Sequence, residues 1–290
     1  MKRFVFLLLF VLCSAFALTA CSSGAGSSSG SANSISANSS GYVSSAESAG
    51  GEVNQADIEK MIVGTWVAAD RDGKPELTNE KIAFDFVSDT KARVSASFAS
   101  APGGTHAWSN SLEADVVISG NKIVLTDHPG EKATAVSEFT VTAISPDEFT
   151  ANHEAVLTVD GKEAGRMKDV TRYVKVDANY GQNILGTWEG RCTSEGSAFD
   201  DGKDHRWEYK ADGTYVYYVK DDDKWVASDN EANEYFVAGN LLCTRWIEGG
   251  KENREWWEVS IDGDAMSWTA LREDDDGKTF TSSFEMKRVA

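Results

Sequence analysis

The chain of 290 residues has little positive charge and few cysteines or histidines, and each scarcity removes a class of function. Lysine and arginine total 28 against 46 acidic residues, so the formal net charge is −18. Such a surface repels nucleic-acid phosphates, and we expect no nucleic-acid partner and no polybasic membrane contact. The four histidines lie far apart in the sequence, and no cysteine pair has a zinc-ligand spacing, so we expect no metal site.

Catalytic signatures are also scarce. The chain has no His-Glu-x-x-His zinc helix and no glycine loop of the kind that cradles phosphate. The acidic runs Asp221–Asp223 and Asp274–Asp276 lack the alternating ligands and terminal glutamate of a calcium loop. We therefore expect neither an enzyme nor a cofactor, and we interpret the acidic runs as solvated turns.

Only one long apolar run is present, and it lies at the N-terminus. Two basic residues precede apolar residues 4–12, and a stretch of mostly small and apolar residues ends at Ala20. This order is typical of a secretory signal peptide. With about fifteen apolar residues, the run is short for a permanent membrane span, which needs ~20. We expect residues 1–20 to be removed from the mature protein.

The residues around the expected cleavage site, Leu18-Thr19-Ala20-Cys21, resemble the lipobox of bacterial lipoproteins. The resemblance implies a palmitate-type acyl chain on the Cys21 thiol, and cleavage before this residue with acylation of the new amino group. Two or more chains matter, because each buried methylene contributes ~0.8 kcal/mol and a single chain anchors only marginally. The alternative is an ordinary signal peptide with a chance cysteine.

The lipobox resemblance also implies a location. The protein is expected to be membrane-anchored and extracytoplasmic, with membrane lipid as its partner through Cys21. Ser22 stands where an inner-membrane retention signal would have aspartate, which favours the outer membrane if the organism is Gram-negative. Residues 21–56 are rich in serine, glycine and alanine and predict a disordered tether.

Two cysteines, Cys192 and Cys243, remain for the folded part of the chain. A disulfide persists in an oxidising extracytoplasmic compartment, so location and parity permit this pair. Pairing also requires Cα atoms within ~7 Å, which the sequence does not determine. A disulfide and two buried free thiols are both open at this point.

An internal repeat indicates two copies of one domain. The segment Met61–Trp66, which ends in Gly-Thr-Trp, recurs as Asn183–Trp188 after about 120 residues, a period too long for a solenoid. We expect the domains to span residues 57–177 and 178–290.

Each copy is predicted to be all-β, because apolar residues alternate with a period of two between Gly- and Asp-rich turn signals. The strands predicted in the first copy are 63–68, 81–88, 91–99, 112–119, 121–126, 133–144, 147–159 and 162–176. Those predicted in the second copy are 186–193, 204–211, 213–220, 224–238, 240–248, 253–262, 264–273 and 278–289. Sequential hairpins favour two tandem up-and-down antiparallel barrels of about eight strands each, a size that holds side chains or one small ligand. A helical turn is expected at 55–61, and a weaker one at 179–183.

Both copies resemble bacterial lipocalin-like domains of the calycin group. The residues that carry the resemblance are Gly-Thr-Trp in the first strand, after a helical turn and before the meander. It implies that Trp66 and Trp188 each close one end of a barrel under a basic side chain. The basic residue over Trp188 is expected to be Arg288, which shares a strand phase with core residues. For Trp66 it is Lys175 or Arg172, and the phase does not decide between them.

Aromatic residues concentrate in the second copy, which holds most of the nine tryptophans. They are either the lining of a ligand cavity or the filling of a small barrel; the candidates for ligand contact are Trp207, Tyr209, Trp257 and Trp268. In the first copy, His153 shares the inward phase and is a ligand contact or a core histidine. Trp256 has the opposite phase among charged residues, which favours a surface contact.

Two functions follow from these patterns. The first is a tethered lipoprotein that binds a small hydrophobic or amphipathic ligand in one or both barrels. The alternative is a structural or interaction lipoprotein with filled barrels that contacts another envelope protein. The interior volume distinguishes them, because ligand binding needs a pocket of roughly a few hundred Å3.

Overall fold

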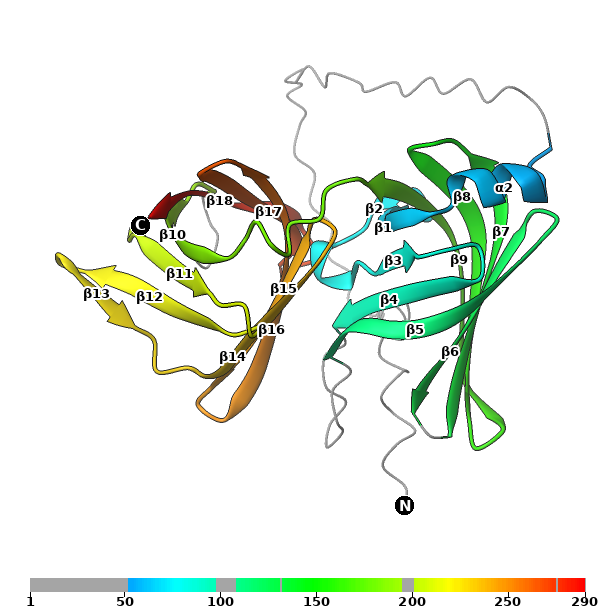
Figure 1. Cartoon of the computed structure of the whole chain (residues 1–290). Helices are drawn as coiled ribbons and strands as arrows, with labels where there is room; N and C mark the ends of the chain where they lie inside the picture. Colours follow the sequence, from blue (N-terminus) through cyan, green and yellow to red (C-terminus); the bar gives the residue numbers. More distant parts are fainter. Residues whose placement is uncertain (1–51, 98–107, 131, 195–200, 275, 290) are drawn as a thin grey trace, which may run out of the picture.

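The computed structural model describes residues 52–97, 108–130, 132–194, 201–274 and 276–289. Their regular structure is almost entirely antiparallel strand, which confirms the all-β prediction of two tandem barrel-like sheets (Figure 1). The expected signal peptide, Cys21 and most of the tether lie outside the described residues. Helix α2 (Gln55–Met61) forms at the predicted position, because Asn54 caps it by accepting a hydrogen bond from the Asp57 amide. No helix in the described ranges is long and apolar enough to cross a membrane.

The first sheet closes into an eight-stranded barrel. Neighbouring strands follow the chain, and β1 pairs with β9 to complete the ring, while the short β2 extends one edge of β1. A 3-10 turn, η1 (Thr78–Glu80), connects β2 to β3. The strands are β1 (Gly64–Arg71), β2 (Lys74–Pro75), β3 (Ala83–Phe86), β4 (Lys91–Ser97), β5 (Trp108–Ser119), β6 (Lys122–Gly130), β7 (Ala133–Ile144), β8 (Glu148–Val159) and β9 (Lys162–Val176).

The second sheet curls without closing. Its order is β13-β12-β11-β10-β18-β17-β16-β15-β14, and an isolated bridge links Thr214, just before β12, to Glu234 on the edge strand β14. The strands are β10 (Gly186–Cys192), β11 (His205–Tyr209), β12 (Tyr215–Asp221), β13 (Lys224–Ala227), β14 (Glu231–Ala238), β15 (Leu241–Glu248), β16 (Lys251–Asp262), β17 (Ala265–Glu273) and β18 (Thr279–Val289).

The opening of the second sheet corrects one strand prediction. The single strand expected at 224–238 is two strands, β13 and β14, which lie at opposite edges of the sheet. Residues 228–230 between them are not in a strand, and they cross the open side instead. The weak helical turn expected at 179–183 is a single turn, in which the Ile184 amide donates to the Tyr180 carbonyl.

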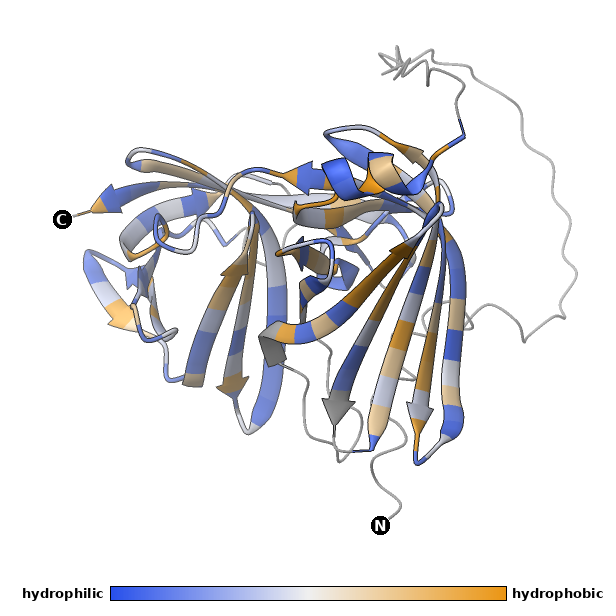
Figure 2. Cartoon of the chain, turned by 45° about the vertical axis from the view of Figure 1, so that its right-hand side comes forward, coloured by the Kyte–Doolittle hydropathy of each residue, from blue (hydrophilic) through white to orange (hydrophobic). Residues whose placement is uncertain are grey.

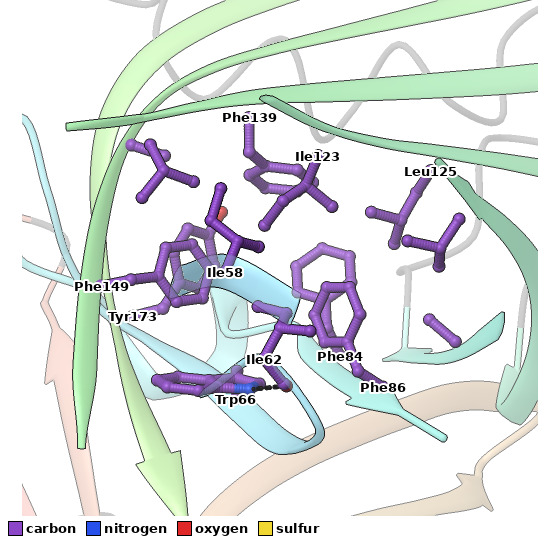
Figure 3. Close-up of a cluster of buried hydrophobic side chains, with 14 of the residues drawn as sticks. Ile58, Ile62, Trp66, Phe84, Phe86, Ile123, Leu125, Phe139, Phe149 and Tyr173 are labelled. Carbon is purple, nitrogen blue, oxygen red and sulfur yellow. Dashed lines mark hydrogen bonds between the residues drawn. The ribbon is translucent and has the colours of Figure 1, made fainter. Parts of the chain in front are cut away.

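Aromatic and aliphatic side chains fill the first barrel. Figure 3 shows Trp66 beneath Ile58 and Ile62, with Phe149 and Tyr173 beside it. The Trp66 and Phe149 rings meet edge to face at a centroid distance of 5.0 Å. The strand colouring in Figure 2 alternates between hydrophilic and hydrophobic, because successive side chains of a strand point to opposite faces. This alternation is the pattern from which the strands were predicted.

The Gly-Thr-Trp segments fold alike in the two copies. Each indole Nε1 donates to the carbonyl four residues earlier, Trp66 to Ile62 at 2.6 Å and Trp188 to Ile184 at 2.7 Å. Both tryptophans are fully buried. The preceding glycines, Gly64 and Gly186, have positive φ values of 127° and 109°, which L side chains rarely adopt.

A basic side chain lies over each of these indoles. The Arg288 guanidinium is 4.1 Å from the Trp188 ring centroid, and the Lys175 ammonium is 5.3 Å from that of Trp66. Of the two residues left open for Trp66, Lys175 therefore occupies the position. Arg172 forms ion pairs with Asp70 and Glu148 instead.

The two sheets pack against each other through a mixed interface. Its apolar part is a cluster that includes Val67 and Ala83 of the first barrel and Phe236, Cys243 and Trp256 of the second sheet. Trp256 has the outward phase predicted from the sequence, but only 2% of its surface is exposed. Its expected solvent exposure is wrong because the first barrel covers that face of the second sheet.

The polar part of the interface lies where β16 and β17 of the second sheet separate. The β16–β17 ladder stops at the Glu258–Thr269 pair. Beyond it, the Trp256 amide donates to Asn79 Oδ1 at 3.0 Å, and the Leu271 amide donates to Thr78 Oγ1 at 2.8 Å. The turn η1 thus supplies hydrogen bonds that a neighbouring strand would otherwise make.

The two cysteines of the folded part are not joined by a disulfide. Cys192 packs against the interior of the second sheet, and its thiol lies 3.4 Å from Ser194 Oγ. Cys243 is buried in the interface cluster. Of the two alternatives, the structure has separate thiols, because the side chains belong to different clusters.

Candidate ligand-binding site

The concave face of the second sheet holds a cavity of about 330 Å3. It opens beside residues 228–230, where the sheet fails to close. Its lining is aromatic and acidic and comprises Asp201, His205, Trp207, Tyr215, Tyr217, Ser228, Asp229, Asn230, Thr244, Trp246, Glu248, Glu255, Trp257 and Trp268.

Three of the four aromatic residues proposed from the sequence line this cavity. Trp207, Trp257 and Trp268 come from β11, β16 and β17, and the Trp207 and Trp268 ring centroids are 4.7 Å apart. Tyr209 is buried in the core instead, where its ring meets that of Tyr235 at 4.8 Å. Aromatic side chains therefore both fill the second sheet and form a cavity wall.

Several lining residues were not proposed from the sequence, although strand phase could have found them. Glu255 shares the inward phase of Trp257 and Val259, and Tyr217 shares that of Tyr215. The Glu255 carboxylate accepts a hydrogen bond from Trp257 Nε1 at 3.3 Å. Burial raises the pKa of Glu255, whereas the nearby charge of Arg272 lowers it in part.

The environment of Glu255 affects the neighbouring phenols. Burial raises the pKa values of Tyr215 and Tyr217, and the negative charge of Glu255 raises them further. Both phenols therefore stay protonated at neutral pH and act as hydrogen-bond donors or acceptors. The cavity thus places a carboxyl group among neutral hydroxyl and indole groups.

His205 contributes a neutral polar edge to the cavity. Its Nδ1 lies 2.8 Å from Tyr217 Oη, and its Nε2 lies 3.2 Å from Asp201 Oδ1. Burial lowers the pKa of this histidine, more than the Asp201 charge raises it. The imidazole is therefore mostly uncharged at neutral pH.

Two buried polar atoms at the cavity lack a partner. Within the described ranges, neither Trp268 Nε1 nor Ser228 Oγ has a hydrogen bond, and only 2% of the Trp268 surface is exposed. An unsatisfied buried donor costs free energy, which a ligand or water acceptor would offset.

The first barrel has a hollow of about 440 Å3 whose lining, unlike that of the second sheet, is mostly polar and charged and includes His153, Glu154, Lys168 and Asp169. His153 points inward, as its phase predicted, and stacks on Phe139 with ring centroids 4.4 Å apart. Its Nδ1 faces Asp169 Oδ1 at 3.5 Å, and Arg71 holds the other oxygen of that carboxylate at 3.0 Å. This arrangement is that of a core histidine. Over the described part of the chain, no three His, Cys, Asp or Glu side chains gather as a metal site.

Comparisons with known proteins give only distant likenesses. No family model and no curated protein matches the chain. Among solved structures, a protein of unknown function from the DUF3598 family of Nostoc punctiforme is 8% identical and covers 81% of this chain and 99% of its own, with a TM-score of 0.23.

A mutant of Transferrin Binding Protein B from Haemophilus parasuis is 11% identical over 72% of this chain and 60% of its own, also with a TM-score of 0.23. A double mutant of that protein is 9% identical over 74% and 61% of the two chains, with the same TM-score. The chain thus spans about three fifths of the transferrin-binding structures. These likenesses are too distant to carry a functional argument.

Proposed function

We propose that this protein is a membrane-anchored, extracytoplasmic binding lipoprotein whose second sheet holds a small amphipathic ligand. The observation that carries the proposal is the aromatic cavity of about 330 Å3. This volume lies in the range of small-molecule pockets, which are mostly apolar with a few placed polar groups. The first barrel, which its own side chains fill, suits the alternative structural role, with an envelope protein as its partner.

The cavity supplies what an amphipathic ligand needs. Trp246, Trp257 and Trp268 contribute indole rings to its wall, and buried apolar area contributes roughly 25 cal/mol per Å2. Glu255, Thr244 and His205 offer polar atoms for orientation. The lipocalin-like arrangement, in which a buried tryptophan of the first strand lies under a basic side chain and a meander follows, supports the same function.

A fluorescence titration tests ligand binding. The chain with Cys21→Ser keeps every described residue and avoids detergent, and the probe is phenylnaphthylamine, which brightens in apolar sites. We expect saturable binding that weakens about tenfold in Trp246→Ala, because this residue lines the cavity. Trp225→Ala is the matched control, since Trp225 lies outside the cavity under the Arg206 guanidinium.

Two results would count against ligand binding. One is the absence of any response to phenylnaphthylamine, fatty acids, quinones, porphyrins or sugars in fluorescence and thermal-shift measurements. The other is an equal loss in Trp246→Ala and Trp225→Ala, which would place the probe elsewhere on the protein.

The lipid anchor has its own test. The full chain, expressed in a bacterium fed an alkyne analogue of palmitate, is expected to carry the label and to fractionate with membranes. The Cys21→Ser variant is expected to lose the label, because it lacks the thiol that the lipobox resemblance marks for acylation. A wild-type chain without label would refute the anchor while leaving the cavity unaffected.

A further inference from the structure

We infer that the cavity of the second sheet selects organic cations, meaning amines or quaternary ammonium groups attached to a flat or compact apolar body. The inference rests on the proposed binding function and names the ligand class of the same site. It combines two independent properties of the lining: the sign of its charge and the chemistry of its walls.

All formally charged residues in the cavity lining are acidic. Asp201, Asp229 and Glu248 lie toward the exposed rim, and Glu255 is more deeply placed. Neither lysine nor arginine occurs among the lining residues that the structure describes. The one histidine there, His205, is kept largely neutral by burial.

The basic group beside Trp257 is already engaged. The Arg272 guanidinium lies 4.7 Å from the Trp257 ring centroid and is not part of the lining. It donates to the Trp256 carbonyl at 3.0 Å and to Asn79 Oδ1 across the interface. Arg272 is therefore held against the first barrel, from which its charge compensates Glu255 only in part, and it is not among the residues that line the cavity.

The cavity walls suit a cation as well as an apolar body. Six of the lining residues are aromatic: Trp207, Tyr215, Tyr217, Trp246, Trp257 and Trp268. The negative face of an indole or phenol ring attracts a cation within ~6 Å of its centroid, and the attraction grows when water is excluded. Recognition of quaternary ammonium groups by aromatic cages uses this interaction.

Glu255 supplies the opposite charge at the inner end. Its carboxylate accepts a hydrogen bond from Trp257 Nε1, and it lies close enough to Tyr215 and Tyr217 for its negative charge to raise their pKa values. A bound ammonium group would compensate this carboxylate in a medium where opposite charges attract strongly. An anion would meet repulsion from Glu255 and from the acidic rim, and a neutral ligand would leave Glu255 with only the partial compensation that Arg272 gives.

The test compares two probes of the same shape. Phenyltrimethylammonium and tert-butylbenzene differ in one atom and in charge, and each is titrated against bound phenylnaphthylamine in the Cys21→Ser chain. We expect the cation to displace the probe at a concentration about tenfold lower than the neutral isostere. We also expect this preference to shrink as salt is raised, because screening weakens the attraction of the exposed rim charges.

Two variants test which residue produces the preference for the cation. Glu255→Gln is expected to reduce the ratio of the two affinities to within about threefold. Glu208→Gln is the matched control, because Glu208 lies on the outer face of β11 and should leave the ratio unchanged. The wild-type ratio and its salt dependence need no variant, so the inference can be tested even if Glu255→Gln fails to fold.

The outcomes separate this inference from the proposed function. Equal affinity for the two isosteres, or a stronger response to the neutral one, overturns the cation inference while ligand binding stands. A cation preference that survives in Glu255→Gln overturns the role of this carboxylate. Failure of phenylnaphthylamine and both isosteres to bind overturns the binding function itself.

Discussion

Asp127 on β6 is a half-buried carboxyl group. In the described residues its Oδ1 has no hydrogen-bond partner, and burial raises its pKa from 3.8 to about 6, with a small opposing effect of His128. The folded protein therefore binds a proton more tightly than the unfolded chain between these values. The stabilising contribution is complete below about pH 4 and is lost as the pH rises through about 6.

We therefore expect Asp127→Asn to be more stable than the parent chain at pH 7 to 8, by about 1 to 2 kcal/mol after allowance for partial exposure. Urea unfolding between pH 4 and 8 measures this difference, which should vanish near pH 4. Asp89→Asn is the control, since Asp89 is exposed. A variant whose stability falls in parallel with that of the parent chain above pH 5 would contradict the assignment.

At the scale of the element, the two Gly-Thr-Trp strands are closed by different basic groups. Arg288 stacks at 4.1 Å on Trp188, donates to the Asn183 carbonyl at 2.7 Å and also bonds the Leu185 carbonyl. Lys175 is 5.3 Å from the Trp66 centroid and reaches the Met61 carbonyl only at 3.4 Å. The arginine closure therefore makes the stronger set of contacts.

Alanine substitutions should rank the two closures. We expect Arg288→Ala to cost about 1 to 3 kcal/mol, because it removes a cation–π contact and leaves carbonyls without donors. Lys175→Ala should cost about 0.5 to 1 kcal/mol. Chemical unfolding followed by tryptophan fluorescence measures both values. The reverse order would mean that the ring contacts do not decide stability here.

At the same scale, the sequence predicts the phase of side chains along a strand more completely than it predicts where strands begin and end. The strands β7 to β9 coincide with their predicted ranges to within one residue, because long alternating runs and Asp-Gly turns leave little choice of register. The range 224–238 is predicted as one strand, although Ser228, Asp229 and Asn230 within it are turn-type residues. Those residues separate β13 from β14, and a local pattern does not contain the position of the two strands at opposite edges of the sheet.

At the scale of the whole molecule, η1 connects the stability of the two sheets. Thr78 and Asn79 satisfy the amides of Leu271 and Trp256, which would otherwise be buried without acceptors. Lys81 adds an ion pair with Glu258 at 2.8 Å. Trp256 and Glu258 belong to β16, the strand that also carries Glu255 and Trp257.

The double variant Thr78→Val with Asn79→Ala should therefore destabilise the second sheet, although both changes lie in the first half of the chain. We expect a loss of about 2 to 4 kcal/mol, from two buried amides left without acceptors. Differential scanning calorimetry measures it, with Thr281→Val on the exposed face of β18 as the control. A transition identical to that of the parent chain would show that the sheets unfold independently of these bonds.

The candidate site shows the same division between local pattern and tertiary arrangement. Trp207, Trp257 and Trp268 were identified from composition and phase, whereas Glu255 was passed over although the same phase points it inward. Tyr209 has the same phase as Trp207, yet it lies in the core, where its ring meets those of Tyr215 and Tyr235. The phase of a residue determines on which face of the sheet its side chain lies. Its position along the curved sheet determines whether that side chain packs in the core or lines the cavity.

The sequence by itself determined the all-β class, the duplication, most strand positions and the inward or outward direction of their side chains, because these depend on periodicity and turn chemistry over a few residues. Tertiary structure alone decided that Trp256 is covered and that Cys192 and Cys243 stay apart. It alone also decided that the second sheet stays open around a cavity. Those features depend on sheet curvature and on contacts between residues far apart in the chain, and local periodicity carries no information about either.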